Sequence, residues 1–178
     1  MKYLIVPVLF LFAVTAFAQV PAIAVIDAQK VVRQSEMGKR ALAEIQGLKD
    51  KKQQEMDQRQ NSIQAMQDKL EKQKDIMTAD QREKTNAEIQ KGVTDLRRFK
   101  EDAENDIQDR LGRAIKSIED RVLPIIQKIG EERGYAVIIQ REQLIYYNAK
   151  NDITDEVIKQ FNDAVAKGNV PPPAPKKP

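Results

Sequence analysis

The chain has 178 residues, of which 32% are charged and 5% aromatic, and its formal net charge is +3. So little bulky apolar material predicts an extended molecule rather than a thick globular core. Because the sequence contains no histidine and no cysteine, the commonest general base, metal ligand and thiol nucleophile are absent, which argues against an enzyme and against a metal site.

Residues 1–18 have the pattern of a secretory signal peptide, with Lys2 as a short positive start. An apolar run extends from Tyr3 to about Val14, and the small residues Ala16 and Ala18 mark a cleavage site. The run is shorter than the ~20 residues that a membrane-spanning helix needs, which favours cleavage over anchoring. We therefore expect an exported chain that, without cysteine, depends on packing alone.

The exported part begins with a strand and a long helix. Ile23 to Asp27 is a short run with apolar residues on both alternate faces, as in a strand covered on both sides. From about Gln29 to Met77 the composition is strongly helical, and heptad stepping from Leu42 meets eleven positions, seven of them apolar. We expect this helix to be only loosely buried, because three basic residues interrupt its seam: Lys49, Lys52 and Arg59.

A return helix makes residues 29–133 an antiparallel hairpin, here called the arm. Two capping patterns, Thr78 with Gln81 and Asp80 with Glu83, place the turn near residues 77–81. Helices of about 50 residues, each rising about 1.5 Å per residue, make an arm of order 75 Å. We expect the arm to bend, because helix-disfavouring residues lie inside it: Gly38, Gly47, Gly92, Gly112 and Pro124.

The chain then returns to a small sheet. Gly134 ends the helix, and the strand-like runs Tyr135 to Ile139 and Leu144 to Asn148 flank a four-residue hairpin loop, QREQ. The hairpin brings residues 19–28 beside these two runs. The sequence therefore predicts an α+β fold in which the arm stands on a three-stranded sheet.

A last helix completes this body, which comprises residues 19–28 and 134–168. Asp152 or Thr154 caps the helix, and the Pro-rich residues 169–178 are expected to be a disordered tail. The predicted sheet keeps open edges and apolar residues on both faces, so its missing neighbours must come from other chains. The residues expected at this oligomer interface are Ile23, Val25, Val137, Ile139 and Ile145.

Two stretches, IAVIDAQKVVRQSEMGKRALAEI and GYAVIIQREQLIYYNAKNDITDEVIKQFN, resemble the two ends of the Skp/OmpH family of periplasmic chaperones. The similarity runs from Ile23 to about Phe161. Its most specific pieces are Val25 to Asp27 with Ser35 to Lys39, and Tyr147 followed by Asp152 to Val157. The resemblance implies a periplasmic homotrimer in which strands of three subunits form a barrel. Three arms would enclose a cavity for unfolded outer-membrane proteins.

The net charge of the exported chain indicates how strongly it could bind anionic partners. Loss of Lys2 with the signal peptide leaves 29 basic and 27 acidic residues, so the exported chain carries a charge of about +2. This value is closer to neutral than in the best-known family members. We expect at most weak contact with an anionic membrane surface or lipopolysaccharide, and no nucleic-acid partner.

The arm carries the candidate client-binding residues. Flexible thioether side chains at Met56, Met66 and Met77 suit a promiscuous apolar surface, although they could merely join the two helices. Charges along the arm, such as Arg97, Arg98 and Lys100, are interpreted as a solvated face. The full client-binding set is Met56, Ile63, Met66, Leu70, Met77, Ile89, Val93 and Leu96.

Two classes of function remain. The favoured one is a holding chaperone that works without ATP or any cofactor, because the sequence has no Gly-rich phosphate loop. The alternative is an exported coiled-coil scaffold or spacer of the cell envelope, which would need a dense seam along the arm.

Overall fold

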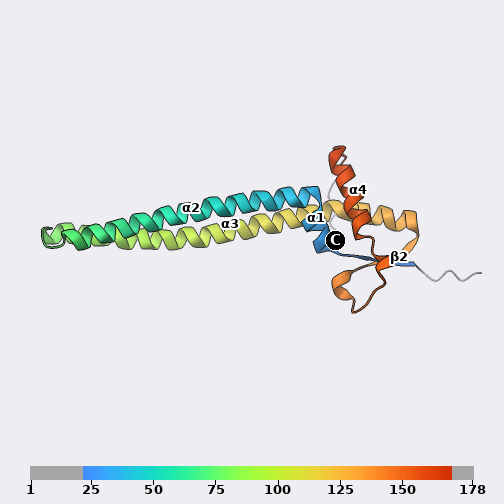
Figure 1. Ribbon diagram of the computed structural model, residues 1–178, viewed down its shortest axis with the longest axis horizontal. Helices are drawn as coiled ribbons and strands as arrows, with labels where there is room; N and C mark the ends of the chain where they lie inside the picture. The colour runs from blue at the N-terminus through green and yellow to red at the C-terminus, as the bar shows by residue number, and fades with distance from the viewer. Residues whose placement is uncertain (1–21, 170–178) are drawn as a thin grey trace, which may run out of the picture.

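The computed structural model describes residues 22–169. The predicted signal peptide and all but the first residue of the predicted tail lie outside this range. Within it, a long arm of two antiparallel helices ends in a small body that holds the sheet and the last helix (Figure 1). No helix between residues 22 and 169 has both the length and the apolar character that a membrane crossing requires.

The first half of the arm is divided into two helices, α1 (Ala28–Gln34) and α2 (Glu36–Gln73). The prediction of one continuous helix from Gln29 to Met77 is therefore wrong at Ser35. Ser35 is extended, and its hydroxyl accepts a hydrogen bond from the Gly38 amide at 3.1 Å. A Cβ atom at Gly38 would lie 1.6 Å from the Val32 carbonyl oxygen, so this break requires glycine at position 38.

The tip of the arm follows the first of the two predicted capping patterns. Helix α3 (Ala79–Arg133) begins after Thr78. The Gln81 amide donates to the Thr78 hydroxyl at 3.2 Å, and the Thr78 amide donates to the Gln81 side chain at 2.9 Å. The predicted end of α3 is also confirmed, because Gly134 adopts a left-handed conformation with φ of 67° and its amide bonds back to the last turn.

The sheet has two strands rather than three. Strand β1 (Ala22–Ile26) pairs in parallel with β2 (Tyr135–Gln140), in a register that places Ile23 beside Val137 and Val25 beside Ile139. The predicted hairpin after β2 is wrong. A 3₁₀ turn, η1 (Arg141–Gln143), follows β2 directly, and residues 144–148 pair with neither strand. A second 3₁₀ turn, η2 (Ala149–Asn151), leads to a single bridge between Asp152 and Val25.

Helix α4 (Thr154–Ala166) crosses the base of the arm (Figure 1). Of the two predicted caps, Asp152 binds the first amide of the helix, which Thr154 donates at 2.8 Å. The Thr154 hydroxyl instead accepts from the Asp27 amide at 2.9 Å. The hydrophobic core lies where α4 and β1 meet the base of the arm, and its buried members are Ala24, Ile26, Val31, Ile118, Val122, Ile125, Ile129, Ile153, Val157 and Phe161.

Candidate functional site

The outer part of the arm contains a small packed cluster. Ile63 of α2 and Ile89 of α3 are both buried between the two helices. Gly92 makes this approach close, because a Cβ atom there would lie 3.1 Å from Cγ1 of Ile63 and 3.8 Å from Cε of Met66. Within the single chain, these residues join the helices.

The other candidate client-binding residues keep part of their apolar surface in solvent. Met56, Met66, Leu70, Met77 and Leu96 are half-buried, and Val93 is exposed. Ile76 was not among the candidates, yet it lies at the turn of the arm with 83% of its surface exposed. The outer arm therefore combines a small packed cluster with partly exposed, adaptable apolar side chains around it.

The basic residues in the seam have a specific partner. The Arg59 guanidinium carbon lies 4.4 Å from the centre of the Phe99 ring, and the Lys52 ammonium lies 5.1 Å from it. Such cation–π contacts contribute about 0.5–1 kcal/mol each at exposed sites. Lys52 and Arg59 therefore help to join α2 to α3, which their interpretation as simple interruptions missed.

The residues proposed at the oligomer interface fall into two groups. Ile23 is exposed and lies in register beside Val137, of which 50% is exposed, and Ile145 is fully exposed. Ile139 is half-buried, whereas Val25 is already buried within the single chain. The outer surface of the body is thus apolar at Ile23, Val137 and Ile145.

A buried carboxylate connects three segments of the body. Asp27 is only 4% exposed, and its Oδ1 accepts from the Lys30 amide at 2.6 Å, which caps α1. Its Oδ2 lies 2.9 Å from Nη1 of Arg141, and its amide donates to Thr154. We call Asp27, Arg141 and Thr154 the Asp27 clamp, because the start of α1, the end of β2 and the start of α4 meet there.

Charged groups beside the clamp have shifted pKa values. Although burial acts to raise it, the pKa of Asp152 lies below its usual range, because hydrogen bonds from Thr154, the nearby Lys30 charge and the Tyr147 hydroxyl favour the carboxylate. The pKa of Lys30 is raised by its hydrogen bond to Asp155, which is 2.6 Å long. Both shifts favour the charged forms at neutral pH.

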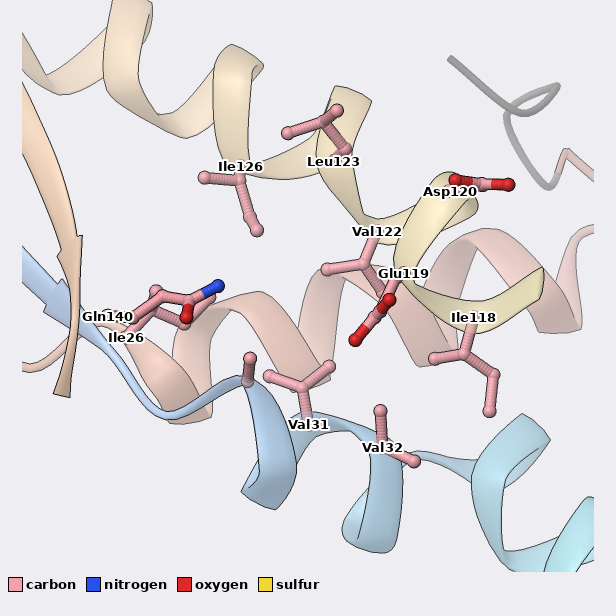
Figure 2. A pocket seen from close by; sticks show the side chains of 11 residues that line it. Ile26, Val31, Val32, Ile118, Glu119, Asp120, Val122, Leu123, Ile126 and Gln140 are labelled. Atoms are coloured by element: carbon pink, nitrogen blue, oxygen red, sulfur yellow. The ribbon is translucent and has the colours of Figure 1, made fainter. Parts of the chain in front are cut away.

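An apolar cavity of about 260 Å³ lies at the base of the arm. Figure 2 shows Val31 and Val32 of α1 facing Val122 and Ile118 of α3 across it, with Glu119 among them. Glu119 thus lies beside an apolar cavity rather than on an open helix face. The neighbouring Asp120, which also lines the cavity, is paired with Lys116 at 3.1 Å.

The comparisons with known proteins identify the family. Residues 22–161 match the family model described as outer membrane protein (OmpH-like). The chain belongs to the OmpH-like family. The resemblance to the Skp/OmpH family that the sequence motifs carry is thereby confirmed.

Two further proteins are similar to this OmpH-like chain. An uncharacterized protein of Aquifex aeolicus (strain VF5) is 24% identical over 139 residues, which cover 78% of this chain and 85% of that protein. A crystal structure from Caulobacter crescentus CB15, provisionally described as an outer membrane chaperone (OmpH-like), superposes with a TM-score of 0.71. The superposition covers 86% of this chain and 89% of the other, at 19% identity, so it shows a shared fold.

The OmpH-like match includes both parts of the candidate site. It begins at Ala22, the first residue of β1, and ends at Phe161 in α4, so it contains the arm and the whole Asp27 clamp. Sequence reasoning offered Asp152 as a cap of the last helix, but it identified the motif around Asp27 without assigning that residue a role. A signal for Asp27 was present, since an Asp directly before a helical stretch is a typical N-cap.

Proposed function

We propose that this protein is an ATP-independent holding chaperone of the periplasm. It binds unfolded outer-membrane proteins between its arms and prevents their aggregation. The proposal rests on membership of the OmpH-like family and on the shared fold with a structure provisionally described as an outer membrane chaperone. The arm supplies the physical reason that clients can bind.

The observation that carries this proposal is the incomplete packing of the arm. Between its tip and the core at its base, the arm buries only Ile63, Ile89 and Ala103 among the described apolar side chains. The remaining candidates, including flexible methionines, keep solvent-accessible surface for weak and adaptable contacts. A coiled-coil spacer would instead bury a regular row of apolar residues along its length.

Assembly into a homotrimer would create the enclosed space. The outer edge of β2 has no partner among the described residues, and the apolar pair Ile23 and Val137 lies exposed on the sheet. Exposed sheet edges of this kind are normally paired or covered. Three copies arranged around their sheets would cover these surfaces and direct three arms to one side.

The test uses the protein without residues 1–18 and an outer-membrane β-barrel protein diluted from urea. We expect the chaperone to keep the barrel protein soluble without nucleotide, and added ATP to change nothing, because no phosphate-binding loop is present in the sequence. Light scattering at 350 nm follows aggregation. Aggregation at the rate seen in buffer alone would contradict the proposal.

A further inference from the structure

A side chain from the last helix of the chain completes the start of the long arm helix. The backbone amide of Glu36, the first residue of α2, donates to Oδ1 of Asn162 on α4 at 2.8 Å. The first amides of an α-helix have no carbonyl partner within the helix, so they need acceptors from elsewhere. In this protein the acceptor comes from a residue 126 positions away in the sequence.

The neighbouring residue Ser35 serves the same helix end locally. Its hydroxyl accepts from the Gly38 amide at 3.1 Å, and its carbonyl accepts from the Lys39 amide at 2.9 Å. A hydroxyl in this position normally serves the second or third amide of a helix and leaves the first one open. Asn162 binds that first amide, so the start of α2 is attached to α4 as well as to α1.

The covalent connection to α1 does not by itself determine the direction of α2. Ser35, with φ −66° and ψ 151°, is the single residue between the two helices. A rotation about its two backbone bonds would swing α2, whose 38 residues form a lever of about 57 Å. A change of about 10° at Ser35 would thus move the far end of α2 by about 10 Å.

The second arm helix does not make the base rigid either. α3 contains Pro124, which has no amide to donate to the Asp120 carbonyl, so one helix hydrogen bond is missing at this level. The apolar cavity of about 260 Å³ lies between α1 and α3 at the same place and includes Asp120 among its lining residues. Packing is therefore incomplete where the arm joins the body, and specific contacts have to set the direction of the arm.

Helix α4 is a firm support for such a contact. Phe161 is fully buried in the core, and Asn162 directly follows it. On the same helix, Asp155 lies 2.6 Å from the Lys30 ammonium of α1. α4 thus binds both α1 and α2, on either side of Ser35 in the sequence.

We propose that Asn162 is a positioning residue for the arm: by capping α2 from α4, it fixes the direction in which the arm leaves the body. The hydrogen bond lies within a single chain, so this role does not depend on assembly. Its consequence for client holding rests on the proposed function, because the directions of the arms set the space between them.

The experiment measures the distance between a residue of the arm and a residue at its base. Because the chain has no cysteine, Gln67→Cys on α2 and Gln127→Cys on α3 carry the only two spin labels. Both positions are exposed. Double electron–electron resonance on labelled protein diluted into unlabelled protein then gives the distance distribution within one chain. We expect a narrow distribution with Asn162 in place and one about twofold broader in Asn162→Ala, because the length of α2 amplifies a small change in angle.

Two further variants test the hydrogen bond itself. Asn162→Asp keeps an acceptor for the Glu36 amide and should restore the narrow distribution. Gln160→Ala is the matched control, because the described bond of this side chain goes to Glu156 within α4, and it should leave the distribution unchanged. A broad distribution in Asn162→Asp, or an unchanged one in Asn162→Ala, would overturn the positioning role.

Folding and client holding are followed separately. If Asn162→Ala loses its helical circular dichroism, Asn162→Gln decides the question, because it keeps the amide but lengthens the side chain by one methylene. Asn162→Gln should shift or broaden the distribution, and an unchanged one would overturn the role. We expect more protein to be needed to suppress client aggregation with Asn162→Ala than with Asn162→Asp. A wild type that fails to hold clients contradicts the proposed function, while the distance measurement still decides the role of Asn162.

Discussion

The guanidinium group of Arg59 on α2 lies over the ring of Phe99 on α3, with 4.4 Å between the guanidinium carbon and the ring centre. This pair joins the two helices in a part of the arm where Ala103 is the nearby buried apolar residue. The middle of the arm is thus held by a charged group and an aromatic ring, in contrast to the apolar cluster of Ile63 and Ile89.

Replacement of Phe99 should loosen the arm locally. In Phe99→Leu the ring face is lost while apolar volume is largely kept, so about 1 kcal/mol of pairing between α2 and α3 should disappear. Hydrogen exchange should quicken at residues 49–60 and 96–105 and stay unchanged in α4. Arg97→Leu serves as the control, because Arg97 is exposed and forms no described ion pair. Equal exchange in wild type and Phe99→Leu would contradict a role for the pair.

Assembly and holding can be separated by shortening the arm. Ile63 of α2 lies beside Gly92 of α3, so replacing residues 60–95 with a brief turn removes matched lengths of both helices. The shortened protein keeps Arg59, Phe99 and the core at the base. We expect it to assemble as the wild type does but to suppress client aggregation less well per mole. Equal suppression by the two proteins would favour the scaffold function.

A charge on the outer face of the sheet should oppose assembly. Val137→Asp places a carboxylate on the exposed apolar surface beside Ile23, where burial against another copy would leave it unpaired. Light scattering should give a lower number of subunits per particle than in the wild type. Val137→Thr, of similar size and without charge, is the control, and its number of subunits per particle should be closer to that of the wild type. A well-folded monomeric wild type would exclude the architecture.

The same substitution should have opposite effects at two glycines of the arm. Gly112→Ala places a methyl group in open space on a helix, so the free energy of unfolding should rise by up to about 1 kcal/mol. Gly38→Ala drives a Cβ atom against the Val32 carbonyl and should destabilise the junction of α1 and α2 by several kcal/mol. Thermal unfolding followed by circular dichroism distinguishes them. Stabilisation by both changes would refute the requirement for glycine at position 38.

Acid should weaken the start of α4. The pKa of Asp152 is lower in the folded protein than in the unfolded chain, so its stabilisation is complete above the unfolded pKa of about 3.9 and is lost as pH falls through the folded value. Asp152→Asn keeps an oxygen that can accept from Thr154 but removes the charge. We expect the variant to be less stable by about 1 kcal/mol at pH 7, with a difference that shrinks below pH ~4. Urea unfolding at fixed protein concentration measures the free energy of unfolding of both proteins. A stability difference that stays constant from pH 7 to pH 3 would argue against a role for the Asp152 charge.

The features that were predicted correctly from the sequence depend on residues that are close together in the chain. Thr78 and Gln81 are three residues apart, and Gly134 ends a helix through its own backbone conformation. The break at Ser35 was missed because helical residues flank it on both sides, while the reason for it lies in the contact between Gly38 and the Val32 carbonyl.

Contacts between residues far apart in the chain were harder to predict from the sequence. The pattern around Ile145 is that of a strand, but a strand forms only beside a partner, and within the described residues none lies next to it. Likewise, the sequence positions of Lys52 and Arg59 did not indicate that both side chains contact Phe99. The register between two long helices determines which residues meet. Seven of the eight candidate client-binding residues lie on the predicted helices, whereas Met77 lies in the turn between α2 and α3. The degree of burial of these residues depended on the register.

The bond from the Asp27 amide to Thr154 joins residues 127 positions apart, and β1 finds its partner strand only after the whole arm has been made. During synthesis, β1 therefore emerges long before the segments that cover it. Local helix formation in the arm takes about microseconds, whereas closing such distant contacts is slow. A newly made chain thus passes through a stage in which its arm is already helical while its own apolar first strand is uncovered. At that stage the protein resembles the unfolded chains that we propose it holds.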